Sequence, residues 1–153
     1  MDKHIVLVGM PGSGKSTLAA RWSAERGVPC YSIDSLLEAK WGRSIGEFVE
    51  HHGWEKFRQE EFAQVKEVLE LPVGIIDAGA GFFTTEEKVK FTLAKAEVIY
   101  LEVAIEELVK RLNSEEERAK RPLLSEGDLR FKLEKLLSER SSFYALAEKV
   151  REG

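Results

Sequence analysis

The chain has 153 residues, of which 43% are hydrophobic and 33% charged, with a net charge of −4 and an isoelectric point near 5.5. This length predicts a single domain over residues 1–153. The acidic balance argues against nucleic-acid binding, and no apolar stretch approaches membrane-spanning length. The one cysteine, Cys30, excludes a disulfide framework and is expected as a small buried group. We therefore expect a monomeric cytoplasmic protein with a small-molecule substrate and no nucleic-acid or membrane partner.

The first motif occupies residues 9–16, Gly-Met-Pro-Gly-Ser-Gly-Lys-Ser, and fits the pattern G-x-x-x-x-G-K-[ST]. An apolar run precedes it and a helical pattern follows, so the loop joins a buried strand to a helix N-terminus. Such loops hold nucleotide phosphates with backbone N–H groups, while the lysine reaches the β- and γ-phosphates and the serine binds Mg²⁺. A glycine-rich turn with a solvated lysine is the less favoured alternative. The residues expected at the nucleotide are Gly12, Ser13, Gly14, Lys15, Ser16 and Thr17.

Along the rest of the chain, short apolar runs alternate with helical patterns, which is typical of a parallel sheet with crossover helices. The expected strands are residues 4–8, 29–32, 73–76 and 97–102. The expected helices are residues 15–25, 34–40, 44–51, 54–69, 85–93, 105–113 and 128–149. The charged segment 114–124 is either a solvated linker or a lid that brings Arg118, Lys120 or Arg121 to the phosphates.

Three charged residues stand out within this pattern. Arg140 falls inside the apolar stripe of the last helix, so its guanidinium either binds an anion such as a substrate carboxylate or reaches water past a packed stem. Arg58 precedes Glu61 by one helical turn, which indicates either a surface ion pair or a guanidinium oriented for a ligand. Asp34 follows a strand, where it either caps the next helix or faces a ligand at the carboxyl edge of the sheet.

Several segments carry a more specific pattern. They are residues 9–17, Tyr-Ser-Ile-Asp at 31–34, residues 42–48 and 53–61, Gly-Ala-Gly at 79–81, Lys-Arg-Pro-Leu-Leu at 120–124 and Glu-Arg-Ser-Ser-Phe-Tyr at 139–144. In this order and spacing they resemble the shikimate kinase family, small P-loop kinases related to nucleoside-monophosphate kinases. The resemblance implies a three-layer α/β P-loop fold with a parallel sheet of order 2-3-1-4, flanked by helices. Residues 148–151 are the candidate for a short fifth strand, residues 34–62 for the substrate-binding helices, and residues 113–126 for the lid.

The same resemblance implies transfer of the γ-phosphoryl group of ATP, with Mg²⁺, to a hydroxyl of shikimate or a similar carboxylated polyol. Asp34 corresponds to the residue that orients or deprotonates this hydroxyl, and Arg58 and Arg140 to the pair that clamps the carboxylate. Arg121 corresponds to a lid arginine at the phosphates, and Arg111 to one that packs on adenine. The substrate loop corresponds to Gly79, Ala80 and Gly81.

The chain departs from the family pattern at several positions. Ser32 stands where the family carries an aspartate, Ala80 replaces a glycine, and the lid is about three residues longer than usual. Asp77 ends an apolar run as a Walker-B aspartate does, so we hypothesise that the metal-supporting carboxylate moved from position 32 to Asp77 on the neighbouring strand. The alternative for Asp77 is a hydrogen bond to a nearby turn. A kinase for another small acid and a nucleotide-binding protein without transfer activity are the alternatives for the whole chain.

Overall fold

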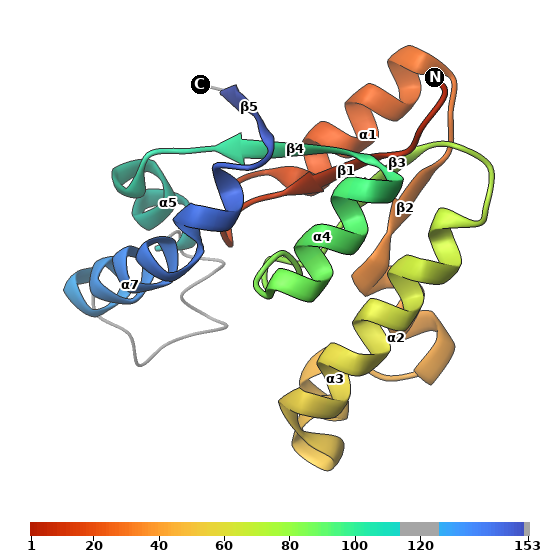
Figure 1. The fold of residues 1–153 in the computed structure, drawn as a ribbon. Coiled ribbons are helices and arrows are strands. Elements are labelled where there is room, and N and C mark those ends of the chain that lie inside the picture. Colours follow the sequence, from red (N-terminus) through yellow and green to blue (C-terminus); the bar gives the residue numbers. More distant parts are fainter. Residues whose placement is uncertain (114–125, 152–153) are drawn as a thin grey trace.

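The computed structural model describes residues 1–113 and 126–151, and its described part is built on a parallel sheet (Figure 1). The sheet has five strands in the order β2-β3-β1-β4-β5, and every neighbouring pair is parallel. This order confirms the expected arrangement, including the short fifth strand for which residues 148–151 are the candidate. The strands are β1 (Ile5–Val8), β2 (Cys30–Ser32), β3 (Ile75–Asp77), β4 (Glu97–Glu102) and β5 (Glu148–Arg151).

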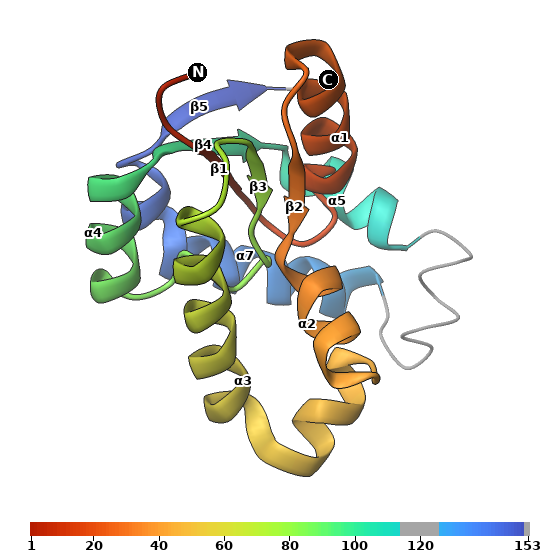
Figure 2. The same ribbon diagram turned by 90° about the vertical axis from the view of Figure 1, so that its right-hand side faces the viewer.

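Helices cover both faces of this sheet. Figure 1 shows α1 on one face, with α4 and α7 on the other, and Figure 2 shows α2 and α3 extending away from the sheet as a pair. The helices are α1 (Lys15–Arg26), α2 (Ile33–Trp41), α3 (Ile45–Leu69), α4 (Glu86–Lys95), α5 (Ile105–Leu112) and α7 (Glu126–Tyr144). The described chain therefore has the three layers that the sequence predicts.

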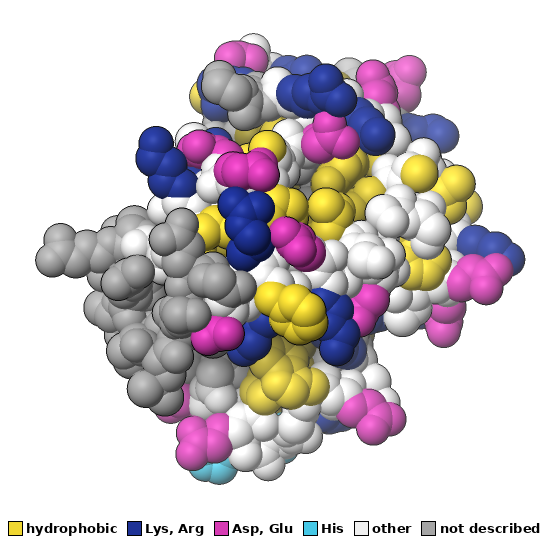
Figure 3. All heavy atoms as spheres, turned by 90° about the vertical axis from the view of Figure 1, so that its left-hand side faces the viewer, with side chains coloured by type: hydrophobic (Ala, Val, Ile, Leu, Met, Phe, Trp, Pro, Cys, Tyr) yellow, Lys and Arg dark blue, Asp and Glu magenta, His cyan; other side chains and the backbone are white. Residues whose placement is uncertain are grey.

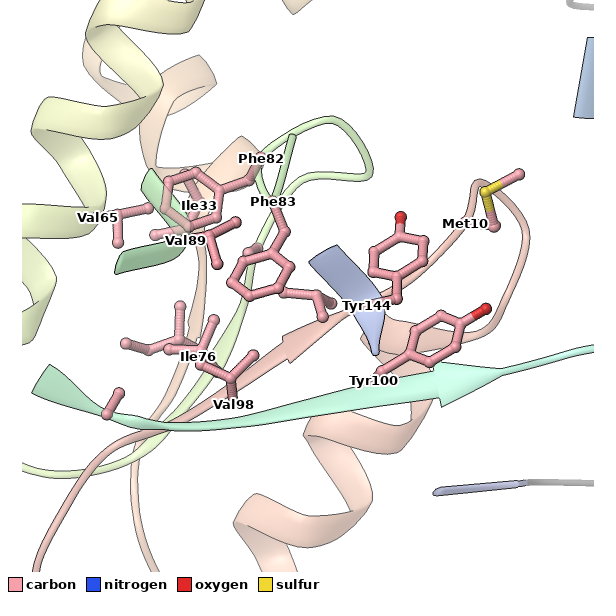
Figure 4. Close-up of a cluster of buried hydrophobic side chains, with 14 of the residues drawn as sticks. Met10, Ile33, Val65, Ile76, Phe82, Phe83, Val89, Val98, Tyr100 and Tyr144 are labelled. Atoms are coloured by element: carbon pink, nitrogen blue, oxygen red, sulfur yellow. The ribbon is translucent and has the colours of Figure 1, made fainter. Parts of the chain in front are cut away.

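The core lies on both faces of the central strand β1, all of whose residues are buried. Val6 and Val8 belong to the larger cluster, under α3, α4 and α7, whereas Ile5 and Leu7 pack on the side of α1. Alternate residues of a strand point to opposite faces, so a fully apolar strand needs helices on both. The larger cluster reaches the phosphate-binding loop, and Figure 4 shows Tyr100 and Tyr144 side by side within it, with ring centroids 4.3 Å apart.

One helix prediction was wrong at its end, whereas the expected break before residue 54 is confirmed. Residues 44–51 and 54–69 are expected as separate helices, and α3, which spans both, is interrupted at Gly53, where φ is 86° and ψ is 162°. The last helix ends at Tyr144 instead of residue 149, because residues 148–151 pair with β4 and Arg151 Nε donates to Glu102 Oε1 at 2.7 Å. Pairing across the sheet therefore overrides the helical pattern at this end of the chain.

Smaller corrections concern the strands β3 and β2, on one side of β1. The expected strand 73–76 is shifted to Ile75–Asp77, so Asp77 belongs to β3. Cys30, expected to be buried, is exposed because it lies at the start of β2, at the edge of the sheet.

Candidate functional site

The loop between β1 and α1 has the conformation that its glycines predict. Gly12 and Gly14 have φ values of 79° and 92°, in the left-handed region that side chains disfavour. Gly14 is also the N-cap residue of α1, and no side chain caps this helix. The free N–H groups of the first turn and the positive end of the helix dipole are therefore available to an anion.

Lys15 lies over this loop and is 9% exposed. Its Nζ donates to Gly9 O at 3.0 Å and to Met10 O at 3.2 Å. Burial lowers the pKa of Lys15 to about 8, while the carboxylates of Asp77 and Asp34 act in the opposite direction. Lys15 thus remains the cation of a largely desolvated site, where its charge would act strongly on phosphate oxygens.

A cavity of about 470 Å³ joins this loop to the predicted acceptor side. It lies at the carboxyl ends of the strands, where ligands bind in open α/β sheets. Three segments of the chain line the cavity: Pro11 to Ser16, Ser32 with Asp34, and Asp77 to Ala80.

Asp34 lies in the first turn of α2, but it is not the cap of that helix. Ser32 is the cap, because its Oγ accepts from the Ser35 backbone N–H at 3.4 Å. Asp34 Oδ1 is buried and has no hydrogen-bond partner among the described residues. Burial is the largest cause that raises the pKa of Asp34, and the charge of Glu38 adds to the rise. The positive charges of Lys15 and Arg58 act in the opposite direction. A buried acceptor without a partner and with a raised pKa suits a group that receives a hydroxyl proton.

The turn formed by residues 79–81 lies against the Arg58 and Glu61 pair. Arg58 Nη1 donates to Glu61 Oε1 at 2.9 Å, and the Glu61 side chain is only 1% exposed, so this is not an ordinary surface ion pair. A Cβ on Gly79 would lie 2.5 Å from Glu61 Oε2, and a Cβ on Gly81 would overlap the Arg58 guanidinium. A methyl group at either position would therefore displace a charged side chain of this pair.

Arg140 reaches the same turn from α7. Its Nη1 donates to Ala80 O at 2.8 Å, across 60 positions of the chain. Arg58 and Arg140, the two arginines expected at the acceptor carboxylate, therefore both lie at the turn of residues 79–81, although they are far apart in the sequence. Ala80 is half-buried and lines the cavity.

Asp77 ends β3 and is the register partner of Ser32 on β2. Burial raises the pKa of Asp77 to about 6, with Lys15 opposing and Asp34 contributing to the rise. Within residues 1–113 and 126–151, no group of three or more His, Cys, Asp or Glu side chains could hold a metal ion. A magnesium site here would combine the exposed hydroxyl of Ser16 and the carboxylate of Asp77 with phosphate oxygens, which is the oxygen ligand set that Mg²⁺ takes.

Arg111 connects α5 to the phosphate-binding loop. Its Nη1 donates to Ser13 O at 3.0 Å and Gly12 O at 3.2 Å, and its Nε donates to Glu107 Oε1 at 3.1 Å. It also lines a cavity of about 780 Å³ between α5, α7 and the ends of β4 and β5. Figure 3 shows hydrophobic side chains exposed among charged ones on this side of the molecule.

Most of the predicted lid lies outside the described residues, including Arg118, Lys120 and Arg121.

Sequence reasoning missed two residues close to these groups. Glu107 pairs with Arg111 at the spacing i,i+4, a signal that the sequence does contain. Lys88 is buried near Glu61. The sequence does not indicate this burial, because Lys88 lies in a charged run before the apolar residues of α4.

A parallel sheet of this order, with a phosphate-binding loop after β1, defines the class of P-loop NTPases, and a family model narrows the class. The model described as shikimate kinase matches residues 11–152. The shikimate kinase of Corynebacterium jeikeium strain K411 is 36% identical over 144 residues, covering 94% of this chain and 75% of that protein. That of Rhodococcus jostii strain RHA1 is 34% identical over 151 residues, covering 99% and 88%. The chain belongs to the shikimate kinase family.

Solved structures agree with this assignment. A shikimate kinase from Bacteroides thetaiotaomicron superposes with a TM-score of 0.89 at 25% identity, covering 96% of this chain and 84% of that one. A shikimate kinase from Acinetobacter baumannii in complex with shikimate gives a TM-score of 0.86 at 26% identity, covering 99% and 84%. In the part of this chain that the structure describes, no helix is both long and apolar enough to cross a membrane.

Proposed function

We propose that this protein transfers the γ-phosphoryl group of ATP to a hydroxyl of shikimate. The observation that carries this proposal is the convergence of Arg58 and Arg140 on the turn at residues 79–81, beside the cavity shared by Asp34 and the phosphate-binding loop. Two guanidinium groups can bind the carboxylate of shikimate. Asp34 Oδ1, which has no hydrogen-bond partner among the described residues, can accept a hydrogen bond from its hydroxyl. A relative of this fold binds shikimate, which supports the same acceptor here.

The phosphate side of the site has a complementary role. Lys15 and the N–H groups of the first turn of α1 would hold the β- and γ-phosphates, and Arg111 would lie beside the base in the 780 Å³ cavity. Asp34 would orient the acceptor hydroxyl and accept its proton, and Arg121 would reach the phosphates from the lid. Most of the rate enhancement in such a site comes from positioning and from charges placed around the transferred group.

Ser16 and Asp77 are the residues that would hold Mg²⁺ in this arrangement. The ion neutralises phosphate charge during transfer when it is bound. Asp77 ends β3 next to Ser32, so its carboxylate occupies the strand end adjacent to the position that lacks one. This placement supports the relocation of the metal-supporting carboxylate from position 32 to position 77.

A coupled assay of ADP formation tests the proposal, with shikimate and other carboxylated polyols such as quinate and gluconate as acceptors. We expect ADP formation to depend on shikimate and to be abolished in Lys15→Met, which removes the cation at the phosphates. Ala80 in the acceptor turn makes the comparison with quinate informative, because a methyl group there changes the space available to the ring. Stronger use of another acceptor, or ATP hydrolysis that ignores every acceptor, would contradict the assignment of shikimate.

We further propose that the protein is a cytoplasmic monomer that uses a small-molecule acceptor and binds neither nucleic acid nor membranes. The net charge of −4 supports this, since no excess of positive charge is available for a phosphate backbone. Analytical ultracentrifugation of the purified protein tests the oligomeric state.

A further inference from the structure

Glu61 is a buried carboxylate whose hydrogen bonding is only half satisfied. It is fully buried in α3, and Arg58 Nη1 donates to its Oε1 at 2.9 Å. Its other oxygen, Oε2, has no hydrogen-bond partner among the described residues. A charged group is costly to bury unless its charge is balanced, and one shared guanidinium balances Glu61 only partly.

Lys88 is the second cation near this carboxylate. It lies in the first turn of α4, is 8% exposed, and places Nζ 5.9 Å from the ring centroid of Phe82. Burial lowers the pKa of Lys88, and Glu61 is the largest influence that opposes this, while Arg58 adds to the lowering. Glu61 in turn has its pKa raised by burial, and both Arg58 and Lys88 counteract that rise.

Several features of position 88 are unfavourable for a lysine, and Glu61 is the largest of the influences that favour its charge, with Glu87 second and the Phe82 ring nearby. Burial removes its hydration, Arg58 repels it, and the first turn of a helix carries a positive partial charge. The other lysine of this part of α4, Lys90, is exposed and pairs with Glu86 at 2.8 Å. Attraction to Glu61 is therefore the largest of the influences that keep a charged lysine at position 88.

The charge count of this group bears directly on the acceptor. At this turn the two carboxylates of Asp34 and Glu61 face the two guanidinium groups of Arg58 and Arg140, so these four side chains carry no net charge and attract an anion weakly. With Lys88 the group carries one net positive charge, and Nη2 of Arg58 lies at the turn of residues 79–81. An acceptor carboxylate that approaches Arg58 then meets an uncompensated positive charge in a partly desolvated site, where charges interact strongly.

We propose that Lys88 is a positioning residue for the acceptor carboxylate, because it balances Glu61 and leaves the charge of Arg58 available to the substrate. The inference rests on the proposed function, since it assigns the carboxylate of the acceptor to Arg58. Lys88 itself does not touch the acceptor in this proposal, and it acts through Glu61.

The test compares Lys88→Met with Lys88→Arg, and uses Lys90→Met as the matched control on the same helix. Trp54 is 59% exposed and its ring centroid lies 5.4 Å from the Arg58 guanidinium carbon, so we expect its fluorescence to change when the acceptor binds without nucleotide. We expect Lys88→Met to raise the Kd and KM for shikimate about 5- to 30-fold, roughly 1–2 kcal/mol. The kcat and the KM for ATP should stay within about twofold of the wild type. Lys88→Arg should restore most of the affinity, and Lys90→Met should have no effect.

The dependence on Glu61 distinguishes this role from general packing. In a Glu61→Gln background there is no carboxylate to balance, so adding Lys88→Met should change the Kd for shikimate less than twofold. A loss of the same size in both backgrounds would overturn the proposal, as would an unchanged Kd in Lys88→Met.

A second measurement does not depend on shikimate. Urea unfolding of the wild type, the two single variants and the double variant measures the coupling between Lys88 and Glu61 directly. We expect Lys88→Met to destabilise the protein more when Glu61 is present than when glutamine replaces it. If the wild type does not use shikimate, the proposed function is wrong. The coupling between Lys88 and Glu61 in urea unfolding would still show whether Lys88 balances Glu61. Additive effects on stability would refute that balance.

Discussion

Replacing Asp77 by Asn should stabilise the protein in the absence of ligands and weaken its use of Mg²⁺ with nucleotide. The structure supplies the reason for the gain in stability. Asp77 is half-buried at the end of β3, and burial raises its pKa from 3.8 to about 6 although Lys15 opposes the rise. The folded protein therefore holds this carboxylate in its charged form at a cost, which an amide of the same shape avoids.

The sign and the size of this effect follow from the two pKa values. Because the folded pKa is the higher one, Asp77 lowers the free energy of unfolding by its full amount above about pH 6, and the loss fades as the pH falls through 6 towards 3.8. The shift corresponds to roughly 3 kcal/mol at 1.36 kcal/mol for each pKa unit. Solvent at a partly exposed carboxylate reduces this, so we expect about 1–2 kcal/mol at pH 8. That range corresponds to a rise in Tm of roughly 2–8 °C for a chain of this size.

Thermal unfolding followed by circular dichroism at pH 8 and pH 4.5 measures this prediction. The gain in Asp77→Asn should be largest at pH 8 and fall to less than about half at pH 4.5, where the wild-type carboxyl group is mostly protonated when folded. Asp2→Asn, at an exposed position, is the control and should show no gain. Calorimetric titration with ADP should show that Mg²⁺ enhances binding less in Asp77→Asn than in the wild type, and Ser32→Asp should recover part of this enhancement.

If Asp77 is a functional carboxylate, Asp77→Asn should raise the stability of the protein and lower the effect of Mg²⁺ on ADP binding. A lower Tm for Asp77→Asn at pH 8 would show that Asp77 makes stabilising hydrogen bonds, as a residue of an ordinary turn would. An unchanged effect of Mg²⁺ on ADP binding would refute the role of Asp77 at the metal, whatever the change in Tm.

The remaining predictions concern the acceptor turn and the sheet. Arg140→Ala removes the 2.8 Å bond to Ala80 O and one charge at the acceptor carboxylate, so steady-state kinetics should show a KM for shikimate raised about 30-fold or more with little change for ATP. Gly79→Ala would place a methyl group 2.5 Å from Glu61 Oε2, and the same kinetics should show acceptor affinity lowered at least about tenfold. His4→Phe breaks bonds of 3.0 and 3.1 Å to the backbone at residues 71 and 74, so urea unfolding should show a loss of about 2–4 kcal/mol.

Each of these changes has a control or an outcome that would contradict it. Arg130→Ala, on an exposed part of α7, should leave the KM for shikimate unchanged. Gly46→Ala should be tolerated, because its Cβ would have only Ser44 Oγ near it, at 3.8 Å. Equal losses for ATP and shikimate in Arg140→Ala would assign that arginine to structure. Stability unchanged in the His4 variant would show that water replaces both of its bonds.

Patterns within a few residues were enough to predict much of the fold. The run at residues 9–16, between an apolar strand and a helix, predicts the loop conformation because its glycines and its lysine have few other uses at that spacing. The sheet order followed from the resemblance, and the structure confirms it. The i,i+3 spacing of Arg58 and Glu61 and the place of Arg140 in an apolar stripe are also local signals, since helical periodicity decides which side chains share a face.

The tertiary structure decided which distant groups meet. Arg111 lies on the carbonyl groups of Gly12 and Ser13, about 100 positions away, and Lys88 lies near Glu61, although neither contact has a local signature. The last helix was expected to continue to residue 149, although residues 148–151 were also the candidate for a fifth strand, and they form that strand because β4 offers backbone hydrogen bonds that a sequence window does not contain. Local spacing thus determined the motifs of this protein, whereas burial and strand pairing determined which charges share one site, because these depend on the whole packed chain.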